Sequence, residues 1–348
     1  MGKNKKDNRR KGMRSLILLL FLTIIMFGTS TYAWFTANRV VTINSLDVHV
    51  EASNGIQIST DAVSWKSVIT NADIKTGAYQ GNVNQVPTNV TAVSTDKTVT
   101  NAGRFNMYSS IIDNDAVSGD YTIETVLESE SAGTTGKYIA FDIFLRVDSS
   151  QTVYLTSESD VTNIGNDDRG LKNAARVAFI NLGHVASDVS SASMTALNAG
   201  TASEVILWEP NYDAHTPVVV NSVAPDYGVT LTETAANSGK YNAAGYRGIS
   251  AVIDPALDLH GVVNGSVVED ASHNAISTPV SVDLQTPEGN SSYNEFDDLA
   301  AGVTKFRVYM WLEGQDIDCE NNATGSDISF KIQLSTQSSA SGSAASSS

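Results

Sequence analysis

The stretch YIAFDIFLRV, residues 138–147, is the most regular in this chain of 348 residues. Its odd-numbered positions, from Ile139 to Val147, are all apolar, whereas its even-numbered positions mix small, charged and aromatic side chains. Successive side chains of a strand point to opposite faces, so the alternation predicts a strand with one fully buried face. A strand of this kind is typical of a β-sandwich or a barrel.

The same alternation returns near the end of the sequence, in FRVYMWL at residues 306–312 and ISFKIQL at residues 328–334, where the even-numbered positions are apolar. Residues 313–327 between them are rich in acidic side chains, so we predict a hairpin with a long acidic loop. Taken together, these strands predict an all-β fold, which we interpret as a jelly-roll-like β-sandwich with long loop insertions.

The sandwich domain is predicted to span residues 44–334. Within it, residues 181–301 are rich in Ser, Ala, Asn, Gly and Thr and hold only isolated apolar islands. This part is interpreted either as insertions that decorate the sheets or as a small second lobe. Residues 335–348 are almost entirely Ser and Ala, cannot bury apolar surface, and are predicted to be a disordered tail.

The amino-terminal end carries an export signal. Residues 1–14 hold seven cations, residues 16–27 are apolar apart from one Thr, and residues 28–33 are small or polar. This order of charged, apolar and small residues is typical of a secretory signal peptide. We therefore predict a signal helix within residues 1–33, cleavage after Ala33 by a signal peptidase, and a secreted protein that is extracellular or at the cell surface.

Two alternatives start from the same apolar run. Residues 16–35 reach about twenty residues, the length of a membrane-spanning helix, so a retained membrane anchor is one alternative. A type IV pilin also begins with a basic head and an apolar helix, but that helix would have to continue. Here residues 40–50 are β-branched and alternating instead, which is typical of strands.

A family resemblance lies in this part of the chain. The run TYAWFT at residues 31–36, followed by NSLDV at residues 44–48, resembles the amino end of TasA/camelysin-type secreted proteins of Gram-positive bacteria. Thr36 stands where that family commonly has Asp, and Ser45 where it commonly has Gly. The resemblance covers residues 28–50. It implies a dedicated signal peptidase and, as in the fibre subunits of biofilms, polymerisation by strand donation.

The segment that cleavage would expose is suited to such donation. The new chain would begin with Trp34 and Phe35, and Val41 and Ile43 share one parity. The apolar parity changes after residues 44–45, so residues 34–43 are predicted to be donated while the next strand stays in its own subunit. Donated strands pair through their backbone, and a head-to-tail contact that does not close builds a filament.

The predicted function is therefore that of a structural subunit of a biofilm-matrix or pilus-like filament, with other copies of the chain as partners. Two alternatives remain open. Residues 39–52 could pair within their own subunit, and the protein could be a monomeric cell-surface adhesin or binding module.

Composition excludes several kinds of partner. The net charge is −16, and removal of residues 1–33 leaves 15 basic and 37 acidic residues, a net charge near −22. Such a charge opposes binding to nucleic acid and to anionic lipid, so membrane contact is expected only through an uncleaved signal segment. The single cysteine, Cys319, cannot form an intrachain disulfide and is predicted to be buried.

The sequence does not contain a catalytic motif that we can identify, so a non-enzymatic protein is predicted. Camelysin-type proteins have been classed as metallopeptidases, but none of the five histidines lies in a His-Glu-x-x-His pair. Glu209, Asp213 and His215 lie close together in residues 208–215, either as a metal or binding site or, as we favour, in a Pro-Asn turn with an aromatic plug.

Calcium is the one cofactor for which the sequence offers ligands. Asp316, Asp318 and Glu320 place carboxylates at alternating positions, as calcium-binding loops do. The loop lacks the Gly at its sixth position and the Glu at its twelfth that an EF-hand requires. We therefore favour a solvated acidic loop and expect no cofactor, with calcium in this loop as the alternative.

Overall fold

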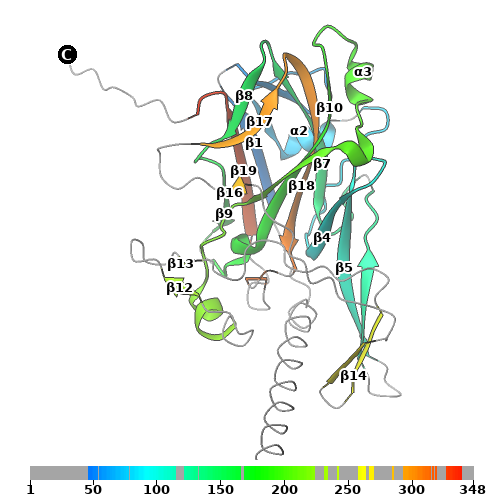
Figure 1. Cartoon of the computed structure of the whole chain (residues 1–348), viewed down its shortest axis with the longest axis vertical. Helices are drawn as coiled ribbons and strands as arrows, with labels where there is room; N and C mark the ends of the chain where they lie inside the picture. Colours follow the sequence, from blue (N-terminus) through cyan, green and yellow to red (C-terminus); the bar gives the residue numbers. More distant parts are fainter. Residues whose placement is uncertain are drawn as a thin grey trace, which may run out of the picture.

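Two β-sheets packed face to face form the body of the protein (Figure 1). The computed structural model describes residues 46–338, apart from positions 54, 78, 115–120, 132, 166–167, 224–230, 234–240, 243–257, 264–265, 270–283, 286–292, 315, 317 and 320–326. The described chain is mostly strand with a few short helices, so the prediction of an all-β sandwich is confirmed.

The smaller sheet contains six strands, and β1 lies between the last strand of the chain and a short edge strand. In spatial order its strands are β17 (Asn294–Leu299), β8 (Gln151–Leu155), β19 (Asp327–Ser335), β1 (Leu46–Ala52) and β3 (Val68–Thr70), with β9 (Asp160–Ile164) also paired to β19.

The larger sheet is built around β18, which pairs antiparallel with a strand on each side. The strands that face the smaller sheet are β2 (Gln57–Ser59), β7 (Ile139–Val147), β18 (Gly302–Glu313), β10 (Ala175–Val185), β11 (Glu204–Glu209) and β16 (Leu284–Gln285).

A second limb of the larger sheet pairs with the end of β18, where Leu312 and Glu313 lie opposite Ala92 and Val93. Its strands are β4 (Ala92–Val99), β5 (Phe105–Asn114), β6 (Tyr121–Leu127), β14 (Asp258–Val263) and β15 (Ser266–Glu269). The remaining elements are the hairpin of β12 (Thr232–Glu233) and β13 (Tyr241–Asn242) and the short helices α2 (Asn71–Thr76), η1 (Leu171–Ala174), α3 (Ser191–Thr195), η2 (Gly200–Ala202) and η3 (Val219–Val223).

The predicted hairpin between residues 306–312 and 328–334 is wrong. Those residues lie in β18 and β19, which belong to different sheets, so the connection between them crosses from one layer of the sandwich to the other. Alternation identifies the face of each strand that is buried, but it does not identify the neighbouring strand. Both strands bury their even-numbered apolar residues in the same inter-sheet core, from opposite sides.

Residues 181–301 contribute to the sandwich itself. β10 ends inside this stretch, β11 pairs with it, and β17 belongs to the smaller sheet. The only described strands outside the two main sheets are those of the β12–β13 hairpin. Five described strands that lie wholly within the stretch, β11, β14, β15, β16 and β17, belong to the two main sheets.

The core lies between the sheets and follows the predicted parity. All five odd-numbered side chains of β7, from Ile139 to Val147, are at most 2% exposed. Phe296 of β17 packs edge-on against Phe179 of β10 at 4.9 Å between ring centroids. Cys319 is also buried there, as predicted.

The outer face of the larger sheet is buried as well. The limb of β4 and β5 covers the part around Tyr309, and α3 and the loop at Tyr79 cover the part around Val303. Tyr309 of β18 packs against Phe105 of β5, with 5.1 Å between the ring centroids. Consequently all twelve residues of β18 are buried. A strand buried on both faces and carrying Lys305 and Arg307 must supply both charges with partners inside the protein.

The predicted signal and donor residues, Ala33, Trp34, Phe35, Val41 and Ile43, lie outside the described residues, and the predictions for them stay predictions. None of the described helices has both the length and the apolarity needed to cross a bilayer.

Replacing Phe330 of β19 by Ala is expected to lower the free energy of unfolding by about 3–5 kcal/mol, because it removes a ring that is 1% exposed between the two sheets. Replacing the adjacent Lys331 by Ala should cost less than about 1 kcal/mol, because its ion pair with Glu158 is exposed. Urea unfolding measures both. Equal costs would contradict the placement of this core.

Candidate functional site

The outer face of the larger sheet holds six buried charged side chains on neighbouring strands, each at most 6% exposed as a whole residue. They are Asp142 of β7, Arg176 of β10, Glu209 of β11, and Lys305, Arg307 and Glu313 of β18. The alternation that points their neighbours into the inter-sheet core turns these residues outward, beneath the covering segments. They form two separate networks.

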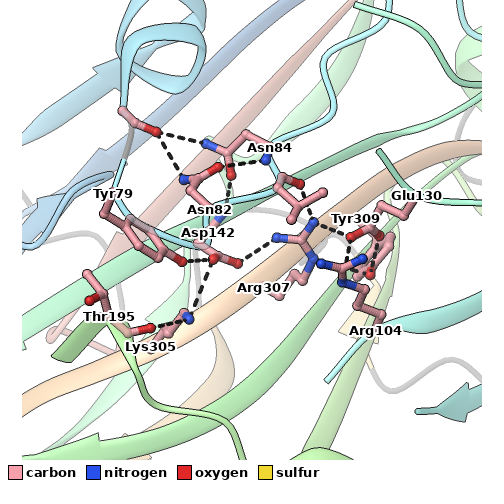
Figure 2. A network of polar contacts seen from close by, with 12 residues as sticks. Tyr79, Asn82, Asn84, Arg104, Glu130, Asp142, Thr195, Lys305, Arg307 and Tyr309 are labelled. Carbon is pink, nitrogen blue, oxygen red and sulfur yellow. Dashed lines mark hydrogen bonds and ion pairs between the residues drawn. The ribbon is translucent and has the colours of Figure 1, made fainter. Parts of the chain in front are cut away.

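The first network centres on Asp142 (Figure 2). Arg307 donates from Nη1 to Asp142 Oδ1 at 2.7 Å. Lys305 Nζ lies 3.5 Å from Oδ2, and the hydroxyl of Tyr79 donates to the same oxygen. The backbone N–H of Asp142 donates to the side-chain oxygen of Asn84 at 3.1 Å, so a loop side chain also holds this carboxylate in place.

Glu130 forms the other end of this network. It pairs with Nη2 of Arg307, and Arg104 Nε lies 3.2 Å from the same carboxylate oxygen. The hydroxyl of Tyr309 donates to the second oxygen at 2.6 Å. Arg307 therefore bridges two carboxylates that come from different parts of the chain, and its Nη2 also donates to the backbone oxygen of Val83 at 2.7 Å.

Burial and the neighbouring charges shift the pKa values of Asp142, Lys305 and Tyr79. Burial alone would raise the pKa of Asp142, but Arg307 and Lys305 outweigh it and hold that pKa below its ordinary value. Burial lowers the pKa of Lys305, and Asp142 only partly offsets this. Burial and the adjacent Asp142 raise the pKa of the Tyr79 hydroxyl, which keeps its proton and donates it.

The second network joins the two acidic stretches singled out in the sequence. Arg176, which is fully buried, pairs with Glu209 Oε1 at 2.7 Å and donates from the same nitrogen to Asp316. His215 Nδ1 lies 2.7 Å from Asp318 Oδ2. Residues 208–215 and the acidic loop after β18 therefore meet through one arginine and one histidine.

The interpretation of residues 208–215 as a turn is confirmed. Trp208 is fully buried in the core, and the chain turns after it. The side-chain amide of Asn211 donates to the backbone oxygens of Val161 at 2.8 Å and Lys172 at 3.2 Å. These bonds fasten the turn to β9 and η1.

Of the predicted calcium ligands, Asp316 is held by Arg176 and Asp318 by His215, whereas Glu320 lies outside the described residues. The residues that the structure describes contain no group of three or more His, Cys, Asp or Glu side chains placed to hold a metal ion. Calcium binding by this loop stays a prediction.

The pKa values of both His215 and Asp318 are raised above their ordinary values. Burial raises the pKa of Asp318 to about 7, against the lowering effect of His215. Burial lowers the pKa of His215. The hydrogen bond with Asp318 and the charges of the nearby carboxylates raise this pKa by more than burial lowers it. Burial raises the pKa of the Cys319 thiol, and nearby Asp316 adds to this, so the thiol stays protonated.

A histidine oriented by a carboxylate also supplies two of the three members of a catalytic triad, the third being a hydroxyl or thiol on the other ring nitrogen. Nε2 of His215 is buried and has no hydrogen-bond partner among the residues that the structure describes. The contact of Nδ1 with Asp318 joins the turn of residues 208–215 to the acidic loop.

Sequence reasoning missed Arg176, Lys305 and Arg307 as site residues. The signal was present, because each is a cation within an otherwise apolar strand pattern. Their partners could not be identified from the pattern. Asp316 is 140 residues from Arg176 in the sequence, and Asp142 is 165 residues from Arg307.

Comparison of the chain with protein-family models, curated proteins and solved structures gives no match. The functional argument therefore rests on the fold and on the geometry of the chain's own residues.

Replacing Asp142 by Asn removes the carboxylate beside Lys305 and Arg307, and we expect the free energy of unfolding at pH 7 to fall by about 3–5 kcal/mol. Because the folded-state pKa of Asp142 lies below the unfolded value of 3.8, its contribution is complete above that pH and is lost as the pH falls through the folded pKa. The difference between parent and variant should therefore narrow below pH 3.8, as measured by urea unfolding.

The matched control is Asp148→Asn, which removes an exposed carboxylate from the turn after the same strand. It should leave the stability near that of the parent. A difference between parent and Asp142→Asn that stays constant on acidification would show that the ion pairs of Asp142 do not stabilise the fold.

Proposed function

We propose that the chain is a secreted structural subunit of an extracellular filament, which polymerises when residues 34–43 of one copy add as a strand to the next. The proposed role is non-enzymatic, and the matrix of a biofilm or a pilus-like fibre is its setting. The resemblance of residues 28–50 to TasA/camelysin-type proteins supports this proposal, as does the all-β sandwich, which presents sheet edges to which strands can add.

One observation carries the proposal: the first and last strands of the sandwich pair in parallel. Every residue of β1 has a partner in β19, from Leu46 opposite Ile328 to Ala52 opposite Leu334. Parallel strands begin at the same end of a sheet. β1 therefore begins at one end of the sandwich, and β19 ends at the opposite end (Figure 1). This arrangement suits subunits that are joined head to tail.

The same pairing suits a fibre under tension. A force applied to the segment before Leu46 would act along the axis of β1. It would load all seven residue pairs between β1 and β19 in shear at the same time. On its other side, β1 is paired at His49–Glu51 with β3. Val48 and Val50 are fully buried in the core. β1 is therefore held by two strands and by the core next to the proposed donor segment.

The donor segment itself supplies the specificity in this proposal. In an added strand, backbone hydrogen bonds give affinity and alternate side chains fill pockets in the partner. Val41 and Ile43 share one parity, so they would enter the same groove of the neighbouring copy. Because the contact joins unlike surfaces, it repeats without closing and extends a filament.

A monomeric cell-surface adhesin or binding module is the second candidate. A polar pocket beside the Asp142 network favours it, because a pocket lined by cations is suited to holding a ligand. Such a protein would bind its partner without residues 34–43.

Removing residues 34–43 is expected to abolish assembly, because no segment remains to add to the next copy. Electron microscopy of the exported chain that begins at Trp34, at neutral pH with and without calcium, should show ordered fibres, and the shortened chain should remain monomeric. Fibres only with calcium would support a role for the acidic loop. Monodisperse monomers of the longer chain under both conditions would contradict the filament proposal and favour the adhesin.

Point variants test the parity within the donor segment. The double variant Val41→Ser, Ile43→Ser should lose fibres, because both side chains of the inserted face become polar. Val40→Ser changes an apolar residue of the opposite parity and should still form them. Loss of fibres in both variants, with the fold intact by circular dichroism, would contradict insertion of one face.

A further inference from the structure

A pocket of about 230 Å³ opens on the outer face of the larger sheet, next to the first buried network. Its floor is formed by Asp142, Lys305 and Arg307. Its walls come from the loop around Tyr79, from residues 195–198 after α3, and from Arg104 in the turn before β5. These residues come from five separate parts of the chain, which meet at this pocket.

The charges around the pocket favour an anion. Three cations line it and only one carboxylate does, that of Asp142. Glu130, which pairs with Arg104 and Arg307, supplies one further negative charge. A positive excess therefore remains, in a chain whose net charge is −16. An anion near this chain would be repelled by most of the surface and attracted here.

Among the described residues, only one of the three cations has terminal nitrogens without any hydrogen-bond partner. Lys305 donates to the backbone oxygens of Thr195 at 2.8 Å and Leu197 at 3.2 Å and pairs with Asp142. Arg307 donates from all three of its nitrogens to protein acceptors. These two side chains therefore shape and charge the pocket, and their nitrogens are already engaged.

Arg104 is different. Its Nε pairs with Glu130 at 3.2 Å, and its side chain is 33% exposed. Its two terminal nitrogens have no hydrogen-bond partner among the residues that the structure describes. A guanidinium with this free edge can hold a carboxylate or a phosphate through two parallel hydrogen bonds.

The size and polarity of the pocket restrict the ligand. Pockets for drug-sized molecules measure about 300–1,000 Å³, so this one fits a smaller molecule, on the scale of one sugar unit. Most of its lining is polar, including the exposed amide of Gln80 and the backbone of Gly81 at the rim. Hydroxyl groups would find partners there, whereas an apolar ligand would not.

We propose that this pocket binds a sugar acid, with its carboxylate on the terminal nitrogens of Arg104 and its hydroxyls on the polar rim. The site lies in residues 79–307 and does not use the donor segment, so it is independent of strand donation. It would let the exported protein attach to an acidic polysaccharide, one sugar acid at a time.

Calorimetric titration of the exported chain at low salt tests this proposal, with D-glucuronate as the probe. D-glucose, acetate and inorganic phosphate serve as comparisons. Glucuronate should bind, acetate at least ten-fold more weakly because it lacks the hydroxyls, and glucose not at all. Absence of glucuronate binding would overturn the proposal. Phosphate binding as tightly as glucuronate would overturn the assignment to a sugar acid.

Three variants locate the site. Arg104→Gln should weaken glucuronate binding at least ten-fold, and Arg104→Lys should weaken it too, because a lysine keeps the charge but loses the two-pronged geometry. Lys331→Gln removes the same charge from an exposed position elsewhere and should bind as the parent does. Circular dichroism checks that each variant is folded. Unchanged binding by folded Arg104→Gln would place the ligand elsewhere and overturn the proposal.

Discussion

Strand β18 is buried on both faces, and the outer half of the structure is arranged around that constraint. One face of β18 lies in the core between the sheets. The other lies beneath the limb of β4 and β5, α3 and the loop at Tyr79. Lys305 and Arg307 on this second face have little access to water, so each needs a protein acceptor. Asp142 of the neighbouring strand serves both. Glu130 adds a second carboxylate to Arg307, and it comes from a segment outside the strands.

Because hydrogen bonds are directional, these buried charges also position the segments that cover the sheet. Arg307 holds the loop at Val83, and Lys305 holds the chain after α3 through two backbone oxygens. Apolar contacts alone would keep these segments on the sheet, but they are non-directional and would not fix which atoms meet. The same segments line the pocket beside Arg104. Structural support and the proposed binding site therefore depend on the same ion pairs.

Assembly and binding are assigned to different parts of the molecule. Assembly would depend on the segment before β1, and β1 itself pairs with β19 in the smaller sheet. Binding would depend on the outer face of the larger sheet, around Asp142 and Arg104. The inter-sheet core separates the two regions, so a filament could form while its subunits keep the pocket available to a ligand. The second network, around Arg176, holds the acidic loop and the turn at Asn211 against the sandwich.

The sequence identified some charged residues of the two buried networks but not the partners that they contact. The sequence singled out two acidic stretches separately. Calcium was the alternative partner for Asp316, Asp318 and Glu320, and Glu209 was placed in a turn. In the structure, Asp316 and Glu209 share Arg176, and Asp318 meets His215. No local pattern reveals such partners, because they lie far away in the chain and meet only when the strands pair.

The sequence by itself determined that the chain forms strands, and which face of each strand is buried, because a strand's side chains alternate with a period of two whatever its neighbours are. Residues 138–147 show this, since every odd-numbered side chain lies in the core. Only the tertiary structure decided that β18 and β19 lie in different sheets, which strands are neighbours, and which charges meet. Alternation is a property of a single segment. Strand pairing and ion pairs each involve two segments, and the connectivity of the chain allows many such pairings until the core forms.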